Sequence, residues 1–163
     1  MAANRVPVIQ NHSSKVQLER ISHVYFEHSD PEKFGTFATD FGLVEAYRDE
    51  AHILYRGYGV DPYCYVARRS EKKSSSFYGS AWVAQTQSEF DKAAALDGAV
   101  ISDLSPFPGG GKKVTLKSPS GFFMNVIFGQ EERVQAAEPL SAQVENFGPL
   151  NGSLNKQRFG KCI

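Results

Sequence analysis

Apolar and polar positions alternate in residues 21–28, and this period of two predicts a β-strand with one buried face. In the residues that follow, apolar side chains recur every three or four positions, which predicts a helix. Ser29 or Asp30 can cap its start, Pro31 suits its first position, and Gly42 ends it. The chain therefore opens with a strand that leads directly into a helix.

More strands are expected after this helix. The candidate strands are residues 43–48, 52–58 and 63–67. A charged turn separates the first two, and the turn at residues 59–62 leads into the third. Residues 69–76 are charged and serine-rich and predict a connector. The first unit is thus strand, helix and three strands, over about residues 21–68.

The same order of elements returns in the second half of the chain. Strands are predicted at about residues 77–85, 99–104, 113–117 and 122–128. Ser88 can cap a helix that ends before Gly98. At a constant offset between the two halves, His23 falls on Ser80. The prediction is one structural unit used twice, with the second copy at about residues 77–129, in an α+β fold.

Length and composition indicate one domain with polar ends. A chain of 163 residues with 41% hydrophobic residues can build one sizeable core, which we place at residues 21–130. Residues 1–20 are polar and irregular and predict an amino-terminal arm. Residues 131–163 have few periodic apolar positions, so they are a tail, a linker or an arm that clasps a partner.

Charge and cysteine content narrow the partners and the compartment. The 18 basic and 18 acidic residues cancel, so neither nucleic acid nor an anionic membrane is the expected partner. The basic positions from Arg68 to Lys73 are interpreted as a solvated loop. Cys64 and Cys162 lack a metal or redox spacing, and no apolar stretch predicts a signal sequence or a membrane span. We expect a cytoplasmic protein.

Two such units, with a histidine in the first strand and a Pro-x-Gly turn before the last, resemble the vicinal oxygen chelate superfamily. This group includes glyoxalases, bleomycin-resistance proteins and extradiol dioxygenases, and the resemblance covers about residues 21–130. Its most specific part runs from Gly109-Gly110-Gly111-Lys112 through Ser118-Pro119-Ser120-Gly121-Phe122 to Asn125-Val126-Ile127-Phe128-Gly129-Gln130. That part is similar to the amino-terminal domain of fungal extradiol dioxygenase-like proteins, which usually lacks the metal. The resemblance implies an open, half-barrel sheet with its site on the concave side.

The superfamily holds a divalent metal through ligands from the first and last strands of its units. By resemblance, His23 matches the first-strand histidine. The other ligand positions hold Ser80, Asn125 in place of the family's glutamate, and Tyr65 or a neighbour. One good ligand cannot hold a metal tightly, so we predict no metal and no other cofactor. A divalent ion at His23, assisted by Glu27 or His28, stays open as an alternative.

Several residues are candidates for chemistry in such a cavity. His23 can serve as a general acid or base, and the alternative is that it is an inert histidine of the core. Asn125, with Tyr65, is either a holder of a substrate oxygen or a filler of the vacated ligand position. Glu27 is either an inward carboxylate with a role or a solvent-facing residue near the strand end. Side chains that would bind substrate, unless they are ordinary core, are Tyr25, Tyr55, Tyr63, Ser80, Trp82 and Phe123. Residues 109–112 do not fit a phosphate-binding loop and predict a lid or turn over one mouth of the sheet.

Three functions remain in view at this point. The first is a metal-independent enzyme that catalyses a proton-transfer rearrangement (isomerisation, epimerisation or cyclisation) of an oxygenated metabolite, in fungal secondary metabolism. The second is a non-catalytic module that binds or sequesters a small molecule. The third is a metal-dependent dioxygenase or glyoxalase, which the missing ligands disfavour. Because half-open sheets leave edges to cover, a homodimer is also expected.

Overall fold

The computed structural model describes residues 10–134 of the chain, which form a mixed sheet with two helices. The first half contains β1 (Leu18–His28), α1 (Pro31–Asp40), β2 (Val44–Arg48), β3 (His52–Arg56) and β4 (Tyr65–Arg69). The second half contains β5 (Ser76–Ala84), α2 (Gln87–Ala94), β6 (Val100–Asp103), β7 (Lys112–Lys117) and β8 (Phe123–Phe128). The predicted order of strand, helix and three strands, used twice, is confirmed.

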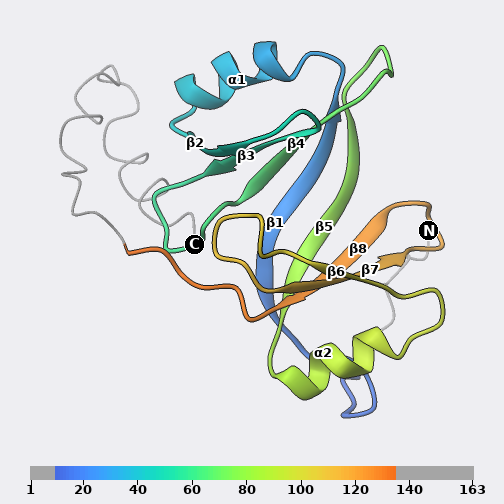
Figure 1. The fold of residues 1–163 in the computed structure, drawn as a ribbon. Coiled ribbons are helices and arrows are strands. Elements are labelled where there is room, and N and C mark those ends of the chain that lie inside the picture. The colour runs from blue at the N-terminus through green and yellow to red at the C-terminus, as the bar shows by residue number, and fades with distance from the viewer. Residues whose placement is uncertain (1–9, 135–163) are drawn as a thin grey trace, which may run out of the picture.

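All eight strands belong to one sheet, in the order β2-β3-β4-β1-β5-β8-β7-β6. Within each unit the first strand pairs in parallel with the last, as β1 with β4 and β5 with β8. The antiparallel pair of β1 and β5 joins the units at the centre of the sheet. The sheet curls into a half-barrel with the helices outside it (Figure 1), so the predicted α+β, half-barrel fold class is confirmed.

The capping residues fix where each helix begins. The Asp30 carboxylate accepts a hydrogen bond from the Lys33 backbone N–H at 2.9 Å, and Pro31 occupies the first turn of α1. Gly42, with φ +93°, follows that helix, a conformation that favours glycine. Thr86 caps α2, in place of the predicted Ser88, because its hydroxyl accepts from the Glu89 N–H.

Some strand boundaries differ from the predictions. β1 begins at Leu18, so the last residues of the predicted amino-terminal arm belong to the sheet. β4 begins at Tyr65 rather than at residue 63. The predicted tail begins within the described residues, where Arg133 donates its backbone N–H to the Val60 carbonyl at 2.8 Å; its continuation lies outside them.

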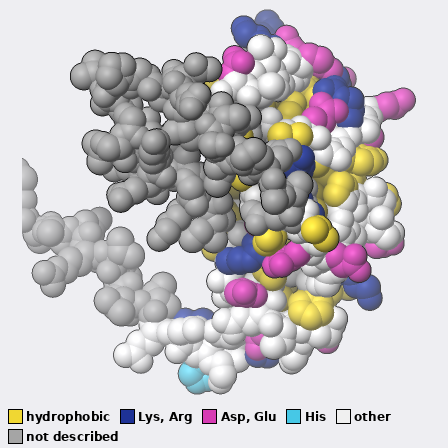
Figure 2. All heavy atoms as spheres, turned by 90° about the vertical axis from the view of Figure 1, so that its left-hand side faces the viewer, with side chains coloured by type: hydrophobic (Ala, Val, Ile, Leu, Met, Phe, Trp, Pro, Cys, Tyr) yellow, Lys and Arg dark blue, Asp and Glu magenta, His cyan; other side chains and the backbone are white. Residues whose placement is uncertain are grey.

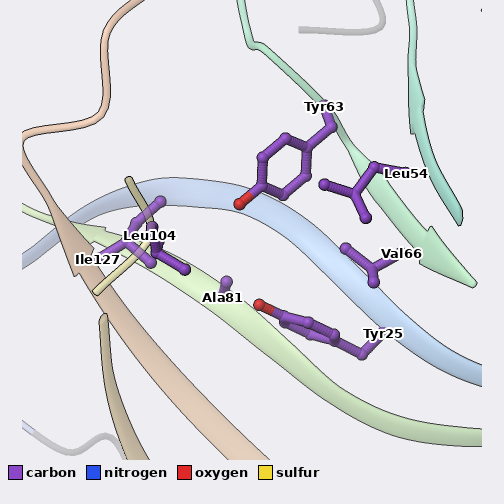
Figure 3. Packing of buried hydrophobic residues seen from close by; sticks show 7 residues of the cluster. All are labelled: Tyr25, Leu54, Tyr63, Val66, Ala81, Leu104 and Ile127. Carbon is purple, nitrogen blue, oxygen red and sulfur yellow. The ribbon is translucent and has the colours of Figure 1, made fainter. Parts of the chain in front are cut away.

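The two faces of the sheet have separate cores. The clusters that contain the helix residues are Ala38, Ile53, Tyr55 and Ala67 against α1, and Ala84, Phe90, Ala93, Val114 and Val126 against α2. The concave face carries the cluster Tyr25, Leu54, Tyr63, Val66, Ala81, Leu104 and Ile127 (Figure 3). Because this last cluster draws on both units, it holds the two halves of the sheet together.

The surface agrees with the balanced composition. On the coloured part of the face in Figure 2, basic, acidic and hydrophobic side chains are interspersed. Among the described residues, no helix has the length and apolar character that crossing a membrane requires.

Candidate functional site

His23 lies at the bottom of the concave face, in the central strand β1. A bulge in the pairing of β1 with β5 falls between Ile21 and His23. The imidazole is 1% exposed, and its Nδ1 is hydrogen-bonded to the Ser22 hydroxyl at 2.9 Å. Its Nε2 is hydrogen-bonded to the Tyr25 hydroxyl at 2.8 Å, and the Tyr63 ring lies 4.6 Å away. Burial, with a smaller contribution from nearby Lys113, lowers the pKa of His23 to about 3.

The position at which the resembling superfamily holds its metal contains few suitable ligands in this chain. The residue opposite His23 on β5 is Ala81, and the residue opposite Ala81 on β8 is Asn125. The Asn125 amide donates to the Ser80 carbonyl at 3.1 Å and accepts from the Thr115 hydroxyl at 2.7 Å. Within residues 10–134, no three His, Cys, Asp or Glu side chains are grouped to hold a metal ion. These residues do not fit a tight divalent site, and the absence of bound metal stays a prediction for metal analysis.

Tyr65 and Tyr55 do not face the concavity, contrary to the prediction. They are partners across β3 and β4 on the helix side of the sheet, and both rings contact Phe34 of α1. The Tyr65 hydroxyl is hydrogen-bonded to His28 Nε2 at 2.9 Å. Alternation in β4 places Val66 on the concave face, so Tyr65 must point to the other side.

Ser80 and Trp82 are also on the helix side. Trp82 is the partner of Val126, which packs in the cluster under α2, and its indole N–H donates to the Ser80 hydroxyl at 2.9 Å. Ser80 was predicted from the constant offset between the two halves, whereas the pairing of β1 with β5 places Ala81 opposite His23. Neither residue can contribute to a cavity on the concave face.

Glu27 lies near the end of β1, beside Arg68 of β4. Its carboxylate makes an ion pair with Lys72 and accepts a hydrogen bond from the Ser76 hydroxyl at 3.3 Å. The hydrogen bond from Lys72 lowers the pKa of Glu27 more than any other contact. The carboxylate therefore has partners of its own, which accounts for its position without a role in catalysis.

A cavity of about 80 Å³ opens above Tyr25 and Tyr63. The side chains that line it are Tyr25, His52, Leu54, Tyr63, Val66, Leu104, Phe107 and Lys113. Both tyrosine hydroxyls point toward Ala81 (Figure 3), so these predicted binding residues do face the concavity. Leu104 and Phe107 come from the loop before β7, and the Phe107 ring lies 5.3 Å from that of Tyr47 in the first unit. Leu104 and Phe107 thus bring this loop to the cavity, while the lid predicted for residues 109–112 stays a prediction.

Two cations near the cavity were not predicted. Lys113, from β7, has its Nζ 5.5 Å from the centre of the Tyr25 ring. The Arg68 guanidinium carbon lies 3.8 Å from the centre of the Tyr78 ring, which in turn stacks on Phe123 at 4.7 Å. Phe123 thus supports this stack instead of lining the cavity. Strand alternation could have indicated the position of Arg68, because it lies two positions after the buried Val66 and therefore points to the same face of the sheet.

A larger hollow of about 220 Å³ lies at the other end of the sheet. It is lined by charges of both signs, and an ion pair of 2.8 Å joins Arg20 to Asp61 on its wall. None of the predicted site residues lines it, so we assign it no ligand.

Comparison with known proteins identifies the fold. No protein-family model and no curated protein matches the chain. Among solved structures, an Mn(II)-bound glyoxalase from Novosphingobium aromaticivorans aligns with a TM-score of 0.64 and 18% identity, over 78% of this chain and 44% of that one. Homoprotocatechuate 2,3-dioxygenase from Brevibacterium fuscum, in an anaerobic complex with 3,4-dihydroxyphenylacetate, aligns with a TM-score of 0.61 and 20% identity, over 78% and 42%. The chain spans less than half the length of these proteins, and at such identities the likeness concerns the fold.

Proposed function

We propose that this domain, which has the vicinal oxygen chelate fold, binds a small molecule in the concave cavity without using a metal ion at the family's position. The observation that carries the proposal is the cavity itself, whose aromatic and cationic walls come from both units. A concave, mostly apolar site with a few placed polar groups is the usual form of a small-molecule site. The dioxygenase of similar fold was solved with an aromatic ligand, 3,4-dihydroxyphenylacetate.

The environment of His23 favours binding over catalysis by that residue. Both ring nitrogens are already hydrogen-bonded, and the side chain lies beneath Tyr25 and Tyr63. A general base works best with a pKa near the working pH, whereas burial lowers the pKa of His23 to about 3. A substrate in the cavity therefore meets the tyrosines before it meets the imidazole.

Proton transfer is the second candidate, and one observation supports it. The Tyr25 hydroxyl is hydrogen-bonded to His23 and its ring lines the cavity. A chain of hydrogen bonds from Ser22 through His23 to Tyr25 can carry a proton without direct contact between the imidazole and the substrate. An isomerisation, epimerisation or cyclisation of an oxygenated metabolite is the reaction class that such a relay would serve.

Protein-observed NMR with catechol and 3,4-dihydroxyphenylacetate as probes tests the proposal. The amide signals of Tyr25, Tyr63 and Phe107 should shift in the presence of a chelator as much as in its absence. Binding that requires added iron or manganese, with stoichiometric metal by mass spectrometry, would contradict the metal-independent site. No shift at any cavity residue would contradict small-molecule binding.

A Tyr25→Phe variant separates the two candidates. A binding module keeps its affinity within a fewfold when this hydroxyl is removed, whereas a relay enzyme loses turnover and still binds. Tyr55→Phe is the matched control, because it removes a buried hydroxyl from the helix side of the sheet.

A homodimer remains part of the proposal. β6 is an edge strand, and Val100 and Ile101 on it are each 60% exposed. Exposed apolar residues on the outer edge of a sheet favour association with another chain. Light scattering coupled to gel filtration should give twice the monomer mass, and a monomer at high concentration would contradict it.

A further inference from the structure

Two positive charges lie beside the concave cavity, one from each unit. Lys113 of β7 lines the cavity directly. Arg68 of β4 has Glu27 and His52 as its strand partners, and its charge reaches both Lys113 and Tyr25. Within residues 10–134, neither cation makes an ion pair. The Glu27 carboxylate makes its ion pair with Lys72, and the neighbouring Arg68 charge contributes less than Lys72 does to lowering its pKa. Asp49 contacts His52.

The two cations are not fully paired with groups of the protein, so they are available to bind a ligand. The Nη1 atom of Arg68 is buried and has no hydrogen-bond partner. Buried polar groups are normally paired, because an unpaired one loses its hydration without compensation. Burial and, to a smaller extent, the nearby Arg68 lower the pKa of Lys113, so the charged form of this lysine is disfavoured. An anion bound by both side chains would give the Arg68 donor a partner and would stabilise the charged form of Lys113.

The geometry indicates which kind of anion. The guanidinium of Arg68 lies against the Tyr78 ring, which holds its planar group of donors in a fixed orientation. Such a group matches the two oxygens of a carboxylate, whereas lysine binds as a point charge. The remaining walls at Tyr25, Tyr63 and Phe107 are aromatic and suit a flat, apolar remainder.

We infer that the ligand of the concave cavity is a small carboxylate with an apolar, preferably aromatic, remainder, whose carboxylate is bound by Arg68 and Lys113. The inference rests on the proposed binding function and adds the chemical class of the ligand. The cavity of about 80 Å³ limits this ligand to a compact molecule, since typical sites for drug-sized ligands are several times larger.

The test compares phenylacetate with phenylacetamide, which have nearly the same shape and differ in charge. We expect NMR titration to give at least tenfold tighter binding of the acid, with shifts at the amides of Arg68 and Lys113. Lys113→Met and Arg68→Met should each weaken binding of the acid about tenfold and leave that of the amide unchanged. Lys112→Met is the matched control, because the neighbouring Lys112 side chain is exposed and should not affect affinity.

The outcomes distinguish the inferred carboxylate ligand from the proposed binding function. Equal affinity for acid and amide would overturn the carboxylate inference and leave the binding function standing, while no binding of either, nor of catechol, would overturn both. Tighter binding of inorganic phosphate than of phenylacetate would overturn the choice of carboxylate. If Arg68→Met fails to fold, Lys113→Met alone carries the test, and unchanged affinity in it contradicts the inference.

Discussion

Replacing His23 with glutamine should make the protein markedly less sensitive to mild acid. The glutamine amide has a donor and an acceptor for the Ser22 and Tyr25 hydroxyls, but it does not titrate. In the folded protein, burial lowers the pKa of His23 from 6.5 to about 3. The unfolded chain therefore binds a proton at this histidine near pH 6.5, whereas the folded protein does not bind it until about pH 3. The folded state consequently loses stability as the pH falls from 6.5 toward 3.

The size of the effect follows from this difference in pKa. One pKa unit corresponds to about 1.4 kcal/mol, so the wild-type protein should lose about 2 kcal/mol of unfolding free energy between pH 7 and pH 5 through His23 alone. Other titrating groups, including His28, contribute to both proteins and cancel when the two pH dependences are compared.

Urea denaturation at pH 7 and pH 5 measures this difference. His23→Gln should show a smaller drop than the wild type by about 2 kcal/mol. Equal drops in wild type and His23→Gln would refute the reasoning, because they would mean that the buried imidazole is protonated as readily as an exposed one.

Three further changes test the packing around the site. Gly79→Ala places a methyl group against the backbone of β8 and should destabilise the protein by about 1–3 kcal/mol in chemical denaturation. Gly57→Ala should change little, because the added methyl group would lie 3.9 Å from the Cys64 sulfur, an ordinary contact distance. Tyr65→Phe removes the hydrogen bond to His28 and should cost about 1 kcal/mol in stability, but phenylacetate affinity should stay at the wild-type value, because this tyrosine is on the helix side. Asp30→Ala removes the cap of α1 and should lower the unfolding free energy by about 1 kcal/mol, while Asp30→Asn should recover most of it.

The order of elements could be predicted from sequence because each strand alternates and each helix is bounded by recognisable residues. β1 and α1 are good examples, since the cap Asp30 and the first helical residue Pro31 mark the boundary between two different periods. Alternation in β1 also places Tyr25 on the face of His23, and Tyr25 lines the cavity. Tyr63 lines it as well, but it precedes β4, so strand alternation does not account for its face.

The composition of the site was harder to predict, because it depends on pairing between distant strands. Alternation shows which residues share a face within a strand, but it does not show which face is concave, and Tyr65 was therefore assigned to the wrong side. The sequence offset between the halves led to Ser80, but the register of β1 against β5, which includes a bulge, places Ala81 opposite His23. Arg68 looked like part of a solvated basic run, and only its register beside β1 places it near the cavity.

The two cations also bear on how a repeated unit can acquire a new property. Arg68 belongs to the last strand of the first unit, whereas Lys113 belongs to the third strand of the second, so the pair does not obey the internal symmetry of the sheet. The carboxylate inferred above would therefore contact one cation from each unit, at positions that are not equivalent in the repeat. Such a site depends on how the two halves are joined through β1 and β5, and neither half alone contains both of its charges.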